Sequence, residues 1–156
     1  MDKIISQETI IGEEMSPIAK LMNQVFFEIK PGASILDAAR MMDEKIVGLL
    51  LVRDGEKLEG VISERDIIKK IVAKNKSHEG LLVKDYMTDK VITVEIDLEV
   101  VEAWKIMKSN NFRHLVVVDP AGQLPVGVVS IKDILEYLAL DHEVSKILEG
   151  LEHRLD

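Results

Sequence analysis

Two predominantly apolar runs stand out along this chain. Gly48–Val52 and His114–Val118 each lead into turn residues, as buried strands commonly do. Each run is preceded by apolar residues at helical spacing, and these follow Ser34 in one case and Asp97 in the other. Serine and aspartate are both common helix N-caps. The pattern therefore predicts, twice, an amphipathic helix followed by a buried strand.

Each predicted helix is preceded by a short stretch with strand character. Val25–Ile29 and Val91–Val94 are rich in β-branched or aromatic residues, which favour strands. After each buried strand, a hairpin leads to a return strand that ends at Ser63 or at Ser130. An aspartate three residues further on completes a pattern typical of a helix capping box.

The same order of elements occurs twice because the sequence repeats itself. Gly60–Ile68 returns as Gly127–Leu135 after 67 residues, and Leu36–Met42 returns as Val101–Met107 after 65 residues. A unit of this size cannot bury both faces of its strands and helices alone, so the two copies should pack together. The fold class expected is α+β, with two β-α-β-β-α repeats about a pseudo-twofold axis.

The domain boundaries follow from the repeat. The polar interval Lys74–Gly80 predicts a linker between the copies, and apolar residues at helical spacing near the C-terminus predict a last helix. The boundaries are an N-terminal extension over 1–15, a first repeat over 16–75, a linker over 76–82, a second repeat over 83–140 and a C-terminal helix over 141–156.

Composition removes several classes of function. Of 156 residues, 47% are hydrophobic and 31% charged, which is typical of a globular protein, and the absence of cysteine excludes disulfides, thiol nucleophiles and Cys-ligated metals. A formal net charge of −8 disfavours nucleic-acid partners. No apolar run is long enough to span a bilayer and no signal peptide is evident, so a cytoplasmic protein with no membrane partner is expected.

Ser63, Asp66 and their counterparts Ser130 and Asp133 allow two interpretations. An ionised carboxylate can accept hydrogen bonds from ribose hydroxyls, and a serine hydroxyl can meet a phosphate. The alternative is that the serines only cap helices and the aspartates only favour the helix dipole. The residue types alone favour capping, because it is the commoner use.

The remaining candidate residues carry little chemistry by themselves. Arg113 and His114 open a buried strand, where they could hold a phosphate or form a solvated strand end. The histidines show no metal-binding spacing, and no nucleophile or acid–base pair is present, so no metal site and no enzyme are expected. Six residues on apolar faces are assigned to the core: Met22, Met41, Met42, Met87, Trp104 and Met107.

The ordered set of motifs resembles the cystathionine β-synthase type (CBS) domain, which occurs in pairs. The resemblance rests on Asp85–Thr88 before a strand and on Arg113–Asp119. It also rests on the signature Gly-x-hydrophobic-Ser-x-x-Asp-Ile, which occurs twice, from Gly60 and from Gly127. It covers nearly the whole chain and implies a disc-like pair with two clefts that bind adenosine-containing ligands. Such pairs regulate attached or partner proteins and commonly form homodimers.

The resemblance implies a regulatory module that binds AMP, ADP, ATP, S-adenosylmethionine or another adenosine derivative. The expected partners are a second copy of the chain and an effector protein. The alternative function is a scaffolding or dimerisation module with degenerate clefts. The survival of serine and aspartate in both signatures favours ligand binding over this alternative.

In the family, each cleft combines the helix start of one repeat with the first strand and the basic strand opening of the other, and this assigns residues to two unequal clefts. The first offers several cations, whereas the second places Glu28 at the position of Thr93, so phosphorylated ligands should prefer the first. The first cleft would use Ser63, Arg65, Asp66, Ile92, Thr93, Arg113 and His114. The second, weaker cleft would use Phe27, Glu28, Val47, Gly48, Ser130, Lys132 and Asp133.

Overall fold

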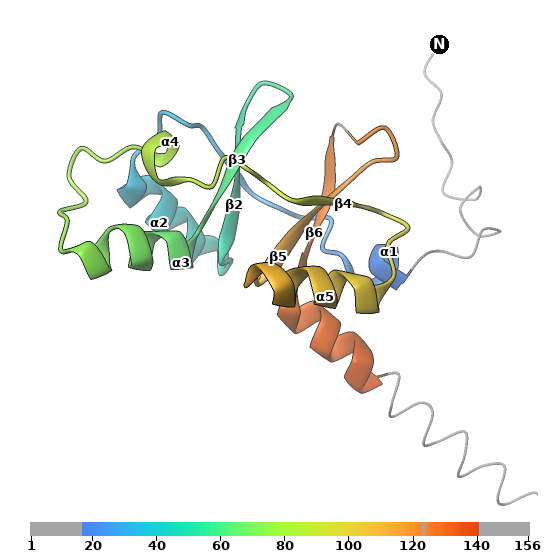
Figure 1. Cartoon of the computed structure of the whole chain (residues 1–156). Helices are drawn as coiled ribbons and strands as arrows, with labels where there is room; N and C mark the ends of the chain where they lie inside the picture. Colours follow the sequence, from blue (N-terminus) through green and yellow to red (C-terminus); the bar gives the residue numbers. More distant parts are fainter. Residues whose placement is uncertain (1–16, 123, 141–156) are drawn as a thin grey trace, which may run out of the picture.

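The structure is a computed structural model that describes residues 17–122 and 124–140, and it shows the two repeats side by side (Figure 1). The predicted N-terminal extension and C-terminal helix lie outside the described residues. The first repeat contains β1 (Glu28–Ile29), α2 (Ile35–Lys45), β2 (Leu49–Asp54), β3 (Lys57–Ser63) and α3 (Glu64–Lys70). The second contains β4 (Thr93–Glu95), α5 (Val100–Asn110), β5 (His114–Val118), β6 (Pro125–Ser130) and a helix over 131–140. The predicted α+β order is confirmed.

Each repeat forms a three-stranded sheet, and the two sheets have the same topology. The first strand pairs in parallel with the second, and the second pairs antiparallel with the third. Glu28 lies opposite Leu51 in the first sheet as Thr93 lies opposite Val116 in the second. This register makes Glu28 and Thr93 equivalent, as the sequence comparison predicted. Every helix in the described part of the chain is too short or too polar to cross a bilayer.

The short leading helices cross between the repeats. In α1 (Pro17–Leu21), Ile18 is buried in the core of the second repeat, whereas in α4 (Val83–Tyr86), Val83 is buried in the core of the first. Between the repeats, the chain continues from α3 through the 3₁₀ turn η2 (Val72–Lys74) to α4. The segment that leads into each repeat therefore completes the other repeat, which holds the pair together.

Serine caps mark where α2 and α3 begin. Ser34 caps α2 by accepting a hydrogen bond from the Asp37 amide, and Ser63 forms a capping box with Asp66 at the start of α3. The prediction of Asp97 as a cap is wrong, because α5 begins at Val100 and its N-cap is Glu99, whose side chain makes no capping bond.

The apolar faces account for most of the core. Met42 and Met107 are buried, and Met22, Met41 and Met87 pack against the core clusters. The assignment of Trp104 to the core is wrong, because 40% of its surface is exposed and its ring lies under the Lys108 ammonium, 4.9 Å from its centroid. The strand predicted over Val25–Ile29 is also shorter than expected, beginning at Glu28.

Candidate functional site

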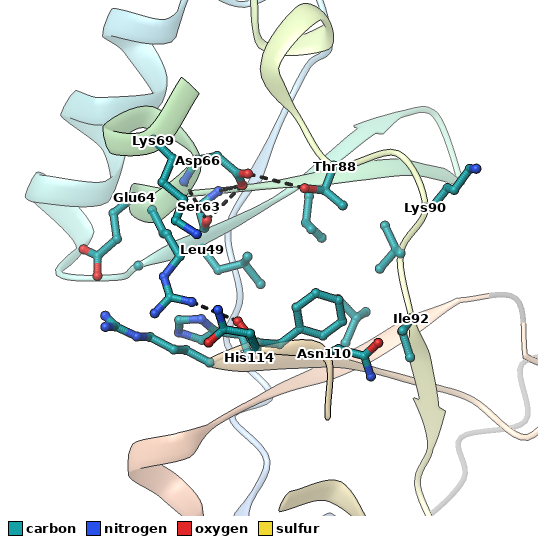
Figure 2. A pocket seen from close by; sticks show the side chains of 18 of the residues that line it. Leu49, Ser63, Glu64, Asp66, Lys69, Thr88, Lys90, Ile92, Asn110 and His114 are labelled. Carbon is teal, nitrogen blue, oxygen red and sulfur yellow. Dashed lines mark hydrogen bonds between the residues drawn. The ribbon is translucent and has the colours of Figure 1, made fainter. Parts of the chain in front are cut away.

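A cleft of about 340 Å³ lies between the two repeats, where α3 and β5 begin (Figure 2). The first repeat supplies the start of α3 and the adjoining ends of its strands, and the second supplies the end of α5 and the start of β5. The chain between α4 and β4 closes one side through Thr88, Lys90 and Ile92. Residues more than 40 positions apart in sequence thus share one cavity.

The side chain of Asp66 is the centre of the polar network in this cleft. Its Oδ2 accepts hydrogen bonds from the amide and the hydroxyl of Ser63, both at 2.9 Å. Its Oδ1 forms an ion pair with Lys70 at 2.8 Å and accepts a longer bond from the Thr88 hydroxyl at 3.4 Å. Asp66 therefore both caps α3 and presents one carboxylate oxygen toward the inter-repeat connection, so that the two interpretations from the sequence are structurally compatible.

The cleft is locally basic in a chain of net charge −8. Its lining contains two acidic residues, Glu64 and Asp66, against five cationic ones: Arg65, Lys69, Lys70, Lys90 and Arg113. Lys70 is engaged by Asp66 and by the Tyr86 carbonyl, 2.8 Å away, and Arg65 donates to the Asn111 carbonyl at 2.9 Å. Lys69, Lys90 and Arg113 form no ion pair with any described residue. The local potential thus favours an anionic ligand.

Apolar side chains form another part of the cleft wall. It includes Phe112, which is half-buried in the connection between α5 and β5, together with Leu49, Val61, Val91, Ile92 and Val116. An aromatic ring and aliphatic side chains offer a planar base a surface on which to stack. Apolar side chains and cations that line one cavity match the two ends of a nucleotide.

His114 lies at the floor of the cleft and carries an altered pKa. Its burial lowers the pKa of the imidazole below 6.5, although the carboxylates of Glu64 and Asp133 oppose this shift and Arg113 adds to it. A Cβ added at Gly48 would lie 3.3 Å from the Glu64 carboxylate and 3.4 Å from the His114 ring, so these side chains approach each other over a glycine. The imidazole is consequently neutral near pH 7.

Six of the seven residues assigned to the first cleft line this cavity: Ser63, Arg65, Asp66, Ile92, Arg113 and His114. Thr93 does not. It lines instead a separate hollow of about 480 Å³ beside the two hairpins.

The residues assigned to the second cleft are less closely grouped in this structure. Phe27 and Val47 pack against the first-repeat core, and Gly48 lines the first cleft. Glu28 was expected to repel a phosphate in the second cleft, but it pairs with Arg53, which compensates its charge. Ser130 and Asp133 repeat the Ser63–Asp66 bonds, and Lys132 pairs with Glu136 at 3.6 Å.

The backbone also corrects one alignment between the clefts. The Gly48 carbonyl accepts the Glu64 amide just as the Arg113 carbonyl accepts the amide of Ile131, which makes Gly48 the counterpart of Arg113. By the same register, Leu49 is the counterpart of His114. The sequence alignment of Val47 and Gly48 with Arg113 and His114 is therefore wrong by one residue. The true counterparts of Arg113 and His114 are the non-polar residues Gly48 and Leu49.

Sequence reasoning missed several residues of the first cleft. Thr88, Lys69, Lys90, Asn111 and Phe112 line it without belonging to the repeated signature. Lys69 and Lys90 were readable as charges in the sequence, but only the packing of α4 on the first repeat brings Thr88 to Asp66. Within the described ranges, no group of three or more His, Asp or Glu side chains is arranged to hold a metal ion.

The comparison with known families agrees with the repeat and the fold. The pattern of the CBS domain matches residues 18–73 and 83–140. The chain belongs to the CBS domain family. An uncharacterized protein of Methanopyrus kandleri is 37% identical over 73% of this chain and 60% of its own length. The chain thus spans less than two thirds of that relative.

Solved CBS structures show the same architecture. A CBS-domain protein from Burkholderia ambifaria is 32% identical, superposes with a TM-score of 0.73, and is matched over 80% of this chain and 92% of its own. The CBS domain pair of protein MJ0100, in complex with 5′-methylthioadenosine and S-adenosyl-L-methionine, is 26% identical with a TM-score of 0.72, over 81% and 98% of the two chains. A CBS pair of this fold thus holds adenosine derivatives.

Proposed function

We propose that this CBS pair is a regulatory module, without catalytic activity of its own, that binds a phosphorylated adenosine ligand in the first cleft. The observation that carries the proposal is that apolar side chains, including Phe112, and five cations line one cavity in a chain that is acidic overall. The adenosine ligands of the MJ0100 pair support the nucleoside part. AMP, ADP and ATP are the preferred candidates, and S-adenosylmethionine, which lacks a phosphate, is the weaker one.

Each part of such a ligand has a matching group in the cleft. The base would stack on Phe112, and a ribose hydroxyl would donate to Oδ1 of Asp66 in place of the long Thr88 bond. The phosphate would face Arg65 and Arg113. His114 is uncharged near pH 7 and could donate one N–H to the phosphate. The second cleft would be weaker, because Gly48 and Leu49 replace the two polar residues Arg113 and His114.

Thermal-shift measurements and calorimetry with AMP, ADP, ATP, S-adenosylmethionine and NAD test the proposal. A ligand present at about 100 times its dissociation constant should stabilise the fold by roughly 2.7 kcal/mol. We expect the phosphorylated ligands to bind more tightly than adenosine. Silence across the whole panel would contradict ligand binding and favour the scaffolding alternative.

We also propose that the module acts as a homodimer and through an effector protein. Large apolar side chains are exposed on the helices, or directly after a helix, in both repeats: Ile46, Ile68, Val72, Val101, Trp104, Leu135 and Leu138. A second copy of the chain could cover them in a twofold arrangement. Light scattering should give a dimer mass, and a monomer mass at high micromolar concentration would contradict this part of the proposal.

A further inference from the structure

We propose that Arg65 is a positioning residue that couples phosphate recognition in the first cleft to the C-terminal end of α5. The inference rests on the proposed function and adds to it a connection between the repeats. The guanidinium Nη1 of Arg65, on α3, donates a hydrogen bond of 2.9 Å to the main-chain carbonyl of Asn111, 46 residues later. This bond crosses the cleft from the first repeat to the second.

The acceptor is well suited to hold a guanidinium. Asn111 is the C-cap residue of α5, with φ 55° and ψ 38°, and its amide closes the helix on the Lys108 and Met107 carbonyls. Carbonyl groups at a helix C-terminus carry partial negative charge, which attracts a cation. The end of α5 therefore fixes the position of Arg65 before any ligand arrives.

A guanidinium is planar and has five N–H donors, so fixing one of them orients the others. With Nη1 on Asn111, the remaining donors of Arg65 stay available to a phosphate in the cleft that Arg65 lines. A phosphate bound there would be connected through one rigid group to both α3 and α5. Ligand binding would thereby tighten the end of α5.

Among the described residues, the second repeat shows no such bridge, so capping alone does not require it. The counterpart of Arg65 is Lys132, which pairs with Glu136 on its own helix at 3.6 Å. The counterpart of Asn111 is Ile46, the C-cap of α2, with the same φ of 55°. The coupling is thus a property of the first cleft.

The test compares AMP with adenosine by calorimetry in the full-length chain and in the variants Arg65→Lys and Arg65→Gln. Lysine keeps the charge but cannot hold the carbonyl and the phosphate through one planar group, so both variants should weaken AMP binding by about tenfold or more. Adenosine binding should change by less than about twofold, because the lost bond goes to the phosphate. Arg40→Lys, at an exposed arginine on α2, is the matched control and should leave both affinities unchanged.

Hydrogen exchange supplies a second readout. AMP should slow exchange of the Asn111 and Phe112 amides in the wild-type chain and not in Arg65→Lys. Faster exchange on binding, or an Arg65→Lys variant with wild-type AMP affinity, would overturn the coupling while leaving the proposed function intact. If neither AMP nor adenosine binds the wild-type chain, the proposed function fails, and this inference fails with it.

Discussion

Ile46 offers a stability test that uses the internal repeat as its own reference. This residue ends α2 in the left-handed conformation, with φ 55° and ψ 48°, and 91% of its surface is exposed. A β-branched residue is poorly suited to this region, where an L-residue is destabilised by about 1–2 kcal/mol, whereas asparagine tolerates it. The second repeat places Asn111 at the same point with φ 55°.

Replacing Ile46 by Asn should therefore raise the free energy of unfolding by about 1 kcal/mol, since most of the conformational cost is removed and little burial is lost. The reciprocal change, Asn111→Ile, should lower it by a similar amount. Urea denaturation at low protein concentration, with unchanged slope, measures both effects. A destabilised Ile46→Asn variant would refute the reasoning, and a loss seen only at high concentration would instead locate Ile46 in a dimer interface.

Two further predictions concern residues around the cleft. Gly60→Ala should destabilise the fold by roughly 2 kcal/mol in urea denaturation, because its Cβ would lie 2.7 Å from the Thr88 carbonyl that accepts the Val61 amide, and an unchanged midpoint would contradict this close approach. Burial lowers the folded-state pKa of His114 below 6.5, so its contribution to stability is fully present above pH 6.5 and is lost as the pH falls from there through the folded-state pKa. His114→Leu introduces the residue found at the equivalent position, Leu49. In denaturation between about pH 7.5 and pH 5, this variant should lose less stability as the pH falls than the wild-type chain does. Equal pH profiles would argue against this role of His114.

Local patterns predicted the repeat, the element order and the serine caps because these features depend on neighbours within a few residues. The prediction of a cap at Asp97 was wrong because α5 begins later, at Val100. The assignment of Trp104 to the core was wrong because helical spacing marks an apolar face without saying how deeply each residue on it is buried. Six residues of the first cleft were predicted through the family resemblance. Thr88 and the Arg65–Asn111 bond depend on packing between the repeats, which no local pattern records.

The same limit explains the one-residue error in aligning the two clefts. The repeat copies differ in spacing, and sequence similarity alone does not say which strand residue faces the helix start. Only the backbone bonds from Glu64 to Gly48 and from Ile131 to Arg113 settle the correspondence. Likewise, Glu28 pairs with Arg53, which lies 25 positions later in the sequence. The negative charge of Glu28 is therefore compensated by a contact that no local pattern predicts.

Titration of AMP into the wild-type chain, Asp66→Ala and Asp133→Ala tests the central claim most directly. The two aspartates form equivalent capping bonds, so each substitution removes the same cap, and unfolding curves verify that both variants are folded. The account predicts that Asp66→Ala loses AMP binding while Asp133→Ala retains it. Loss of binding in Asp133→Ala with wild-type affinity in Asp66→Ala would contradict the assignment of the phosphorylated ligand to the first cleft.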